Sequence, residues 1–268
     1  MSGTALITGA SSGLGLQYAR LFAADKNDLV LVARRKERLE ALAAELSGTH
    51  GVTAHVVADD LADPSAPRRI VDEVKARGLA IEYLVNNAGF GTAGPFAEIE
   101  PAKTLDMLQV NVVALVSLTR SFIPEMVRRG HGRVLNLGST AGFQPGPFMA
   151  VYYASKAFVN SFTEALWYEL KGTGVTATVS CPGATATEFS AVAGTERSRL
   201  FSLGAMSAEE VAREGYLAML KGKPIAVHGL KNKVLASSVR FSPRAIVRGI
   251  AATMNKSPGD GTSAQLKS

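Results

Sequence analysis

Cysteine, tryptophan and histidine are scarce in this 268-residue sequence, which has one Cys, one Trp and four His. A single thiol cannot form a disulfide within the chain, and Cys181 ends an apolar run where a buried, inert thiol is expected. No histidine stands near Cys, Asp or Glu at the spacing of metal ligands. We therefore expect neither a disulfide framework nor a metal site.

Long apolar runs are also missing, because none approaches the roughly 18–20 residues that a membrane-spanning helix needs. No basic leader with an apolar stretch and a cleavage site precedes the first predicted strand, which starts near residue 4. We expect a soluble, intracellular protein located in the cytoplasm. With 47% apolar residues, a chain of this length fits one large domain better than two.

Acidic residues are nearly missing from the C-terminal segment. Residues 221–268 contain nine Lys or Arg and one Asp, whereas residues 1–220 contain twenty basic and twenty-two acidic side chains. A nucleic-acid-binding protein usually spreads basic and aromatic residues over its main fold. The net charge is +6, but the excess positive charge is confined to residues 221–268. We therefore expect no nucleic-acid partner.

Short apolar runs rich in β-branched residues alternate with stretches of helical period. The runs are nearly continuous, as expected of parallel strands covered on both faces, and they fall at 5–7, 29–33, 53–57, 83–85, 134–137, 176–180 and 225–227. Helices are predicted at about 13–25, 36–47, 67–77, 101–128, 151–171 and 207–221, with Pro124 bending or ending the fourth. This order predicts a doubly wound, seven-stranded parallel α/β sheet, a Rossmann fold, in one domain over residues 1–230.

A glycine-rich turn, Thr8-Gly9-Ala10-Ser11-Ser12-Gly13-Leu14-Gly15, follows the first predicted strand. Glycines let the backbone approach a pyrophosphate closely, and the next helix offers N–H groups and the positive end of its dipole. Small residues also serve in ordinary turns and in helix packing, so the turn alone favours a nucleotide site only modestly.

A second polar group, Ser139 with Tyr152, Tyr153 and Lys156, lies far along the chain. Tyr152 and Lys156 are four residues apart on a predicted helix and share a face. With TGASSGLG at 8–15, NNAG at 86–89, Asn111 and PG at 182–183, the set resembles the short-chain dehydrogenase/reductase family. The resemblance covers about residues 1–230 and favours an NADP-preferring branch with a C-terminal extension.

The resemblance implies catalytic roles. The family pattern Y-x-x-x-K selects Tyr152 rather than Tyr153 as the acid that protonates the substrate oxygen. Lys156, with the positive charge of the oxidised nicotinamide, would lower the pKa of that phenol by ~3 units, and it would bond the nicotinamide ribose. Ser139 would hold the substrate oxygen, and Asn111 would keep a water chain to Lys156. On an arbitrary helix, Tyr152 and Lys156 would be interpreted as an exposed aromatic residue and a solvated lysine. That interpretation does not explain Ser139, Asn111 and the glycine-rich turn together.

The resemblance also implies a cofactor-binding set, much of which follows the carboxyl ends of predicted strands, where open α/β sheets bind ligands. Asp60 and Leu61 would meet the adenine, and Thr187 the nicotinamide carboxamide. For Asn86 a structural role between strands is equally compatible. The set comprises Gly9, Ser11, Ser12, Gly13, Leu14, Gly15, Arg34, Arg35, Asp60, Leu61, Asn86, Ala88, Gly89, Tyr152, Lys156, Pro182, Gly183, Thr185 and Thr187.

The end of the second predicted strand favours NADP(H) over NAD(H). An acid at this position would hold the ribose 2′-OH and repel a 2′-phosphate. Here Ala33 is followed by Arg34, Arg35 and Lys36, and arginine offers a planar, permanently charged fork for phosphate. The alternative, a cluster that only solvates the next helix, is weaker because cations at a helix N-terminus oppose the dipole.

The substrate pocket is predicted to be apolar, for a ketone or an aldehyde. Residues 188–206 contain Gly194 with several Ser and Arg residues and are interpreted as a lid. The expected lining is Gly142, Phe143, Phe148 and Met149, with Phe189, Leu200, Phe201 and Leu203 from residues 188–206.

Residues 231–268 are predicted to form a basic helical extension and a frayed tail. Ser242 and Pro243 are expected to cap and open a helix that ends near Met254. One side of this helix would carry Ile246, Ile250 and Met254, and another Arg244 and Arg248. Packing of the apolar side on the domain or on a second subunit is favoured over membrane-surface contact through residues 242–254.

The combined prediction is an NADPH-dependent oxidoreductase that transfers hydride between the nicotinamide and the carbonyl or secondary alcohol of an apolar small molecule. A homodimer or homotetramer is expected. Two alternatives stay open at this stage: an alcohol dehydrogenase working in the oxidative direction, and a non-catalytic NADP(H)-binding sensor or scaffold.

Overall fold

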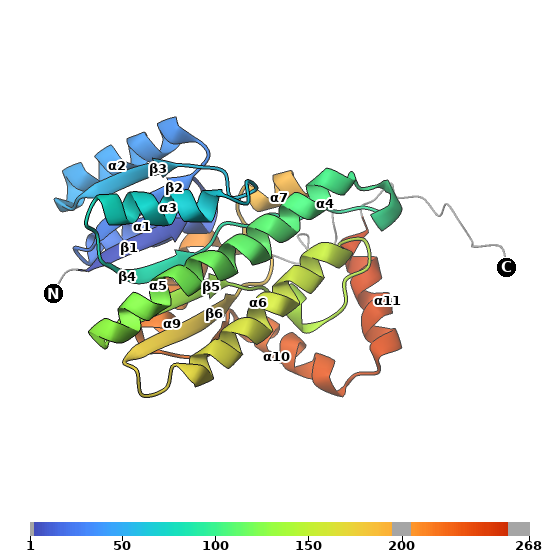
Figure 1. Cartoon of the computed structure of the whole chain (residues 1–268). Coiled ribbons are helices and arrows are strands. Elements are labelled where there is room, and N and C mark those ends of the chain that lie inside the picture. The colour runs from blue at the N-terminus through green and yellow to red at the C-terminus, as the bar shows by residue number, and fades with distance from the viewer. Residues whose placement is uncertain (1–2, 195–204, 257–268) are drawn as a thin grey trace.

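The computed structural model describes residues 3–194 and 205–256, which form a sheet between two layers of helices (Figure 1). Seven parallel strands lie in the order β3-β2-β1-β4-β5-β6-β9. This is the doubly wound fold predicted from the apolar runs. The strands are β1 (Thr4–Thr8), β2 (Asp28–Ala33), β3 (Ala54–Ala58), β4 (Ile81–Asn86), β5 (Gly132–Leu137), β6 (Val175–Cys181) and β9 (Ile225–Val227).

The helices connect the strands as crossovers and also form the C-terminal segment. A small second sheet pairs β7 (Thr185–Ala186) with β8 (Met206–Ser207). The helices are α1 (Gly13–Ala24), α2 (Lys36–His50), α3 (Ala66–Ala76), α4 (Pro101–Leu108), α5 (Leu115–Arg129), α6 (Ala150–Glu169), α7 (Phe189–Ala193), α9 (Ala208–Leu220), α10 (Leu230–Ser238) and α11 (Arg244–Asn255). Shorter helical turns are η1 (Phe96–Glu98), η2 (Gln109–Ala114), η3 (Thr140–Phe143) and η4 (Val239–Phe241).

The core is divided between the two faces of the sheet. On one face, α1, α2 and α9 pack side chains such as Phe22, Leu39 and Met219 against the strands. On the other, α3 and α5 contribute Ile70 and Leu118. The inner strands β1, β2 and β5 are buried at nearly every position, whereas the edge strands β3 and β9 are only partly buried. Burial on both faces explains why the apolar runs are continuous.

The long fourth helix has an irregular segment before Pro124 that the sequence did not predict. Helix α5 continues through Pro124 and ends at Arg129, so the proline does not end it. The irregular part is η2, a π-helical segment that contains Asn111 and joins α4 to α5. Such segments are rare and occur often at functional sites.

The combined stretch Pro101–Arg129 is, among the described residues, the one helix long and apolar enough to cross a membrane by length and composition. Leu118, Phe122 and Met126 of this stretch pack in the core, whereas Leu105 and Val113 are 65% and 47% exposed. Core helices of globular domains pass the same test of length and composition.

The C-terminal helix α11 differs from the prediction in two respects. It begins at Arg244, and the Ser242 hydroxyl donates to Ser238 O, 2.9 Å away, instead of capping the helix. Its buried residues are Val247, Ala251 and Asn255, so the predicted side with Ile246 and Ile250 is not the one that packs on this domain. Those two isoleucines are 56% and 61% exposed.

Candidate active site

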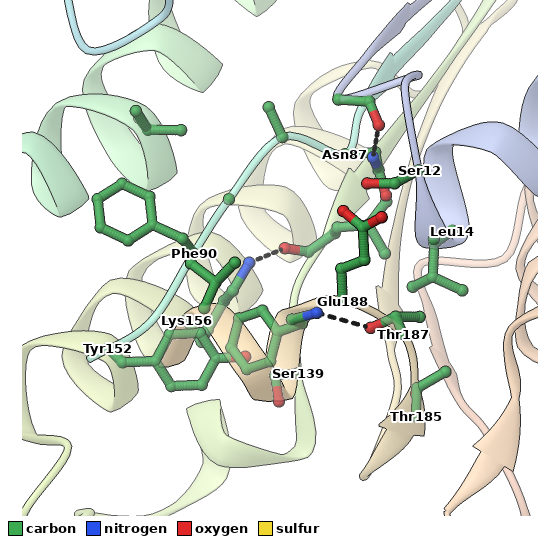
Figure 2. Close-up of a pocket in the computed structure, with 18 of the residues that line it drawn as sticks. Ser12, Leu14, Asn87, Phe90, Ser139, Tyr152, Lys156, Thr185, Thr187 and Glu188 are labelled. Carbon is green, nitrogen blue, oxygen red and sulfur yellow. Dashed lines mark hydrogen bonds between the residues drawn. The ribbon is translucent and has the colours of Figure 1, made fainter. Parts of the chain in front are cut away.

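A cavity of about 480 Å³ opens at the carboxyl ends of the central strands. Figure 2 shows Ser139, Tyr152 and Lys156 grouped together in it, with Ser12 and Leu14 across from them. Most of the sequence-predicted site residues line this cavity. They are Gly9, Ser11, Ser12, Gly13, Leu14, Arg34, Arg35, Asp60, Leu61, Ala88, Gly89, Ser139, Tyr152, Lys156, Pro182, Gly183, Thr185 and Thr187.

The turn between β1 and α1 depends on its glycines. Gly9 and Gly13 adopt φ values of +66° and +54°, a region that L-residues rarely occupy. A Cβ on Gly15 would lie 2.2 Å from Gly9 O, so α1 packs directly on the turn. Gly15 packs on the turn and is not among the residues that line the cavity, and its contact with a cofactor stays a prediction.

Arg35 is held against this turn by several hydrogen bonds. Its Nη2 donates to Ser11 Oγ at 3.1 Å and to Ser12 Oγ at 2.8 Å. Its Nη1 lies 2.9 Å from Glu188 Oε2, and Arg38 Nη1 lies 2.7 Å from Glu188 Oε1. Both arginines thereby hold the pKa of Glu188 below its ordinary value. A carboxylate from the segment after β7 thus occupies an arginine cluster at the edge of the cavity.

Asn87 and Phe90 line the cavity although the sequence analysis did not single them out. Asn87 Nδ2 donates to Thr8 O at 2.9 Å, which joins the segment after β4 to the end of β1. Asn87 stands beside Asn86 in the NNAG motif, so the motif itself was the available signal. Asn86 points away from the cavity and donates to Thr119 and Asn136 inside the domain, which supports its structural reading.

Asn111 is buried within η2 and contacts the segment after β4. Its Oδ1 accepts from Phe90 N at 3.0 Å, and its Nδ2 donates to Phe90 O at 2.9 Å and to Ser155 Oγ at 3.1 Å. Asn111 does not line the cavity but holds the backbone that borders it, and its water chain to Lys156 stays a prediction. It fixes the backbone beside Gly89, where an added Cβ would lie 3.5 Å from Lys156 Nζ.

Ser139 stands at the end of β5 and caps η3. Its Oγ accepts from Ala141 N at 3.1 Å and lies 3.3 Å from Pro182 O, to which it can donate. These two partners hold the hydroxyl at the junction of β5 and β6, and it is 7% exposed.

Tyr152 and Lys156 project from α6 toward Ser139. Lys156 Nζ donates to Leu137 O at 2.6 Å and lies 5.9 Å from the centre of the Tyr152 ring. Burial lowers the pKa of Lys156 to about 8. Burial raises the pKa of Tyr152, and its hydrogen bond with Ser139 acts in the opposite direction. Among the protein's own groups desolvation outweighs the hydrogen bond from Ser139, and the lowering of the phenol pKa by Lys156 and the oxidised nicotinamide stays a prediction.

Tyr153 faces a different part of the molecule. Its hydroxyl donates to Asn255 Oδ1 at 3.0 Å, and Asn255 Nδ2 donates to Pro147 O at 2.9 Å. These bonds connect α6, the loop before it and the end of α11. Tyr153 is 5% exposed, so it acts as a packed wall of the cavity whose hydroxyl is already engaged.

The predicted substrate pocket is correct only in part. Met149 and Phe189 line the cavity, together with Val192, but Gly142, Phe143 and Phe148 do not. A Cβ on Gly142 would lie 2.6 Å from Lys156 O, which shows that η3 packs on α6. Phe143 packs beside Leu115 and Val159 instead, and Lys256 Nζ lies 5.3 Å from the Phe148 ring centre. The predictions for Leu200, Phe201 and Leu203 lie outside the described residues.

The site is suited to a nicotinamide dinucleotide. Side-chain-free glycines at the β1–α1 turn leave the backbone open to a pyrophosphate, and the N-terminus of the 12-residue α1 faces the same turn without a side-chain cap. A helix N-terminus of this kind favours anions. The cavity then extends from this turn to Ser139, Tyr152 and Lys156.

The family model described as short chain dehydrogenase matches residues 3–198. The chain belongs to this family. Sulfoacetaldehyde reductase 2 of Chromohalobacter salexigens is 42% identical over 194 residues, or 72% of this chain and 76% of that protein. Serine 3-dehydrogenase of Agrobacterium fabrum is 38% identical over the same share of each chain.

Solved structures of the family share the fold over nearly the whole chain. A short-chain dehydrogenase from Sphingobium yanoikuyae in complex with NADPH has a TM-score of 0.79 and 32% identity, covering 89% of this chain and 94% of that one. A 7beta-hydroxysteroid dehydrogenase has a TM-score of 0.83 and 26% identity, covering 93% and 96%. The protein is therefore an oxidoreductase of the short-chain dehydrogenase family, whose members typically use a nicotinamide cofactor.

Proposed function

We propose that this short-chain dehydrogenase uses NADPH to reduce an apolar ketone or aldehyde. The observation that carries the proposal is one cavity that joins the glycine turn and Arg35 to Ser139, Tyr152 and Lys156. Each of these groups suits a different part of the reaction: phosphate binding, carbonyl polarisation and proton donation.

Support for NADPH comes from the end of β2. Ala33 offers no carboxylate for a ribose 2′-OH, and Arg34 and Arg35 both line the cavity. The hydroxyls of Ser11 and Ser12 hold the Arg35 guanidinium at 2.8–3.3 Å. Less side-chain entropy is therefore lost when a ligand binds to Arg35. A related structure is described in complex with NADPH.

Support for an apolar substrate comes from the opposite end of the cavity. Phe90, Met149, Phe189 and Val192 contribute apolar surface to the cavity, and the Phe189 ring centre lies 5.3 Å from that of Tyr152. Among the cavity-lining residues that the structure describes, the basic side chains are Arg34 and Arg35 beside the glycine turn and Lys156 beneath Tyr152. This lining favours an uncharged carbonyl compound over the sulfonate named for the C. salexigens relatives.

The residues divide the work of carbonyl reduction as follows. When bound, the reduced nicotinamide supplies the hydride. Ser139 donates a hydrogen bond to the carbonyl oxygen, and Tyr152, kept neutral by its raised pKa, gives its proton to that oxygen as negative charge develops. The Lys156 ammonium then stabilises the tyrosinate, and Asn111 holds the Phe90 backbone that borders the reacting groups.

The test measures NADPH and NADH oxidation at 340 nm with aliphatic, aromatic and steroid-like ketones and aldehydes, and with sulfoacetaldehyde as a charged comparison. We expect turnover with NADPH on uncharged carbonyls. Tyr152→Phe should lower kcat by about 10²–10⁴-fold while leaving the NADPH dissociation constant nearly unchanged.

Tyr153→Phe is the matched control, since it removes the neighbouring hydroxyl from the same helix. It should lower kcat by far less, because that hydroxyl serves Asn255. A larger loss in Tyr153→Phe would show that the acid has been assigned to the wrong tyrosine. Cofactor binding without turnover on any carbonyl or alcohol would favour a sensor, and preference for sulfoacetaldehyde would contradict the apolar pocket.

A further inference from the structure

Helix α10 exposes an apolar ridge on the surface of the molecule. Leu230, Val234 and Leu235 are 77%, 60% and 63% exposed, and Phe241 in the following turn η4 is 89% exposed. No residue of α10 is fully buried. Large apolar side chains are common on protein surfaces singly, but four within twelve residues form a patch that calls for an explanation.

Basic side chains flank this ridge. At about 100° per residue, Leu230 and Val234 share one face of α10, and Lys231 and Lys233 project roughly 80° to either side of it. Leu235 projects about 120° from that face, beyond Lys231, and is not on the crest. Both lysines are exposed, and Arg240 immediately precedes Phe241. No Asp or Glu occurs anywhere in residues 221–256, which contain eight Lys or Arg. The patch is therefore apolar along its crest and positively charged along its sides.

We propose that this α10 patch, formed by Leu230, Lys231, Lys233, Val234, Arg240 and Phe241, docks on the surface of an anionic lipid bilayer. Apolar side chains would enter the interface between headgroups and acyl chains, and the lysines would extend to the headgroups on each side. Uniform positive charge complements anionic lipid. In this proposal the α10 patch binds the surface of the bilayer, and no helix crosses it.

A second copy of the chain fits this patch less well. A two-fold symmetric contact places the same patch on both subunits, so Lys231, Lys233 and Arg240 would face the same cations with no acidic residue nearby in sequence. Such like-charge contacts oppose association. A bilayer surface presents only the complementary charge.

Helix α11 is not part of this surface, although membrane contact was the less favoured interpretation of its sequence. At about 100° per residue, Arg244 and Arg248 project from nearly the opposite side to Ile246 and Ile250. The isoleucines and the arginines of α11 cannot reach one flat surface together. Figure 1 shows α11 beside the start of α6, which agrees with the hydrogen bond between Asn255 and Tyr153.

The inner side of α10 places the patch directly behind the active-site cavity. Asn232 Nδ2 donates to His228 O at 2.8 Å, and a Cβ on Gly183 would lie 2.5 Å from that Nδ2 atom. Gly183 lines the cavity. A membrane-docked α10 would therefore hold the cavity close to the bilayer, where apolar molecules accumulate.

The experiment measures sedimentation of the full-length protein with vesicles of phosphatidylcholine alone and with about 30% phosphatidylserine. We expect binding to the anionic vesicles that weakens with salt. Each basic residue near an anionic surface contributes about fivefold, so Lys231→Gln/Lys233→Gln should weaken binding about 25-fold. Leu230→Gln/Val234→Gln/Phe241→Gln should weaken it by more than tenfold.

The control is Ile246→Gln/Ile250→Gln, which removes exposed apolar side chains from α11 and should leave vesicle binding within twofold. Circular dichroism and NADPH affinity confirm that every variant is folded. Equal binding to both vesicle types, no binding to either, or an equal loss in the α11 variant would overturn the proposal. Light scattering on the same variants identifies the remaining occupant: a fall in oligomeric mass without vesicle binding would make the patch a subunit interface.

Discussion

Replacing Glu188 by Gln should tighten NADPH binding. The Glu188 carboxylate lies 2.9 Å from Arg35 Nη1 and 2.7 Å from Arg38 Nη1, so it holds the guanidinium that we assign to the 2′-phosphate. Two anions cannot both make the shortest contacts with one cation. The carboxylate therefore competes with the cofactor, and a neutral amide of the same shape should compete much less.

The size of the effect follows from the exposure of the three side chains, which is 49% for Glu188, 41% for Arg35 and 51% for Arg38. Ion pairs this exposed contribute ~0.2–1 kcal/mol each, or ~0.4–2 kcal/mol for the two. If NADPH binding must break both, Glu188→Gln should lower its dissociation constant by about 2- to 30-fold. NADH has no 2′-phosphate, so its dissociation constant should change less and the preference for NADPH should increase.

The assay is fluorescence titration of both cofactors at low and high salt. Glu45→Gln is the matched control, because Glu45 forms an ion pair of similar exposure with Arg20 away from the cavity and its loss changes the net charge equally. That control should leave both affinities within twofold. Weaker NADPH binding in Glu188→Gln would refute competition and indicate that Glu188 closes over bound cofactor, and equal tightening of NADH would refute the assignment of Arg35.

Three further predictions concern single residues. Gly15→Ala should destabilise the protein by ~1–3 kcal/mol in urea unfolding, since its Cβ would lie 2.2 Å from Gly9 O. The same substitution should weaken NADPH binding at least tenfold. A variant as stable as the unchanged protein would contradict the packing of α1 on the turn. NADPH affinity should fall as pH rises through about 8, where Lys156 loses its charge, and Lys156→Met should remove this break. Burial lowers the pKa of His228 despite its bond to Glu214, so the unfolded chain binds more protons than the folded protein. The free energy of unfolding should therefore fall as pH drops below about 6.5. His228→Gln should make the free energy of unfolding depend less on pH between pH 7.5 and 5.5.

The strands and the motif positions could be predicted because they depend on local rules. Continuous apolar runs identify strands covered on both faces, and glycine spacing identifies the β1–α1 turn. The exception at Pro124 has a tertiary cause: α5 is held along the sheet by residues such as Leu118 and Phe122, and this packing carries the helix past the proline. The π-helical segment around Asn111 has no comparable sequence signal.

Contacts between distant segments could not be predicted from periodicity. The ion pair between Glu188 and Arg35 joins residues 153 positions apart, and neither residue type indicates its partner. In α11, periodicity shows which residues share a face but not which face packs. Ile246 with Ile250 and Val247 with Ala251 are neighbouring apolar stripes, and the hydrogen bonds of Asn255 decide that the second is buried. The domain boundary at residue 230 and the number of subunits stay predictions.

The two adjacent tyrosines show how partners, rather than burial, assign roles on one helix. Burial raises the pKa of both Tyr152 and Tyr153, so desolvation alone does not distinguish an acid from a packing residue. Tyr152 meets Ser139 and lies beside Lys156, whereas the Tyr153 hydroxyl is committed to Asn255. The match to the family model ends at residue 198, yet Asn255 fixes the wall next to the proposed acid. The C-terminal helix α11 is therefore part of the active-site architecture, and deleting it should disturb the pocket even though every catalytic candidate precedes it.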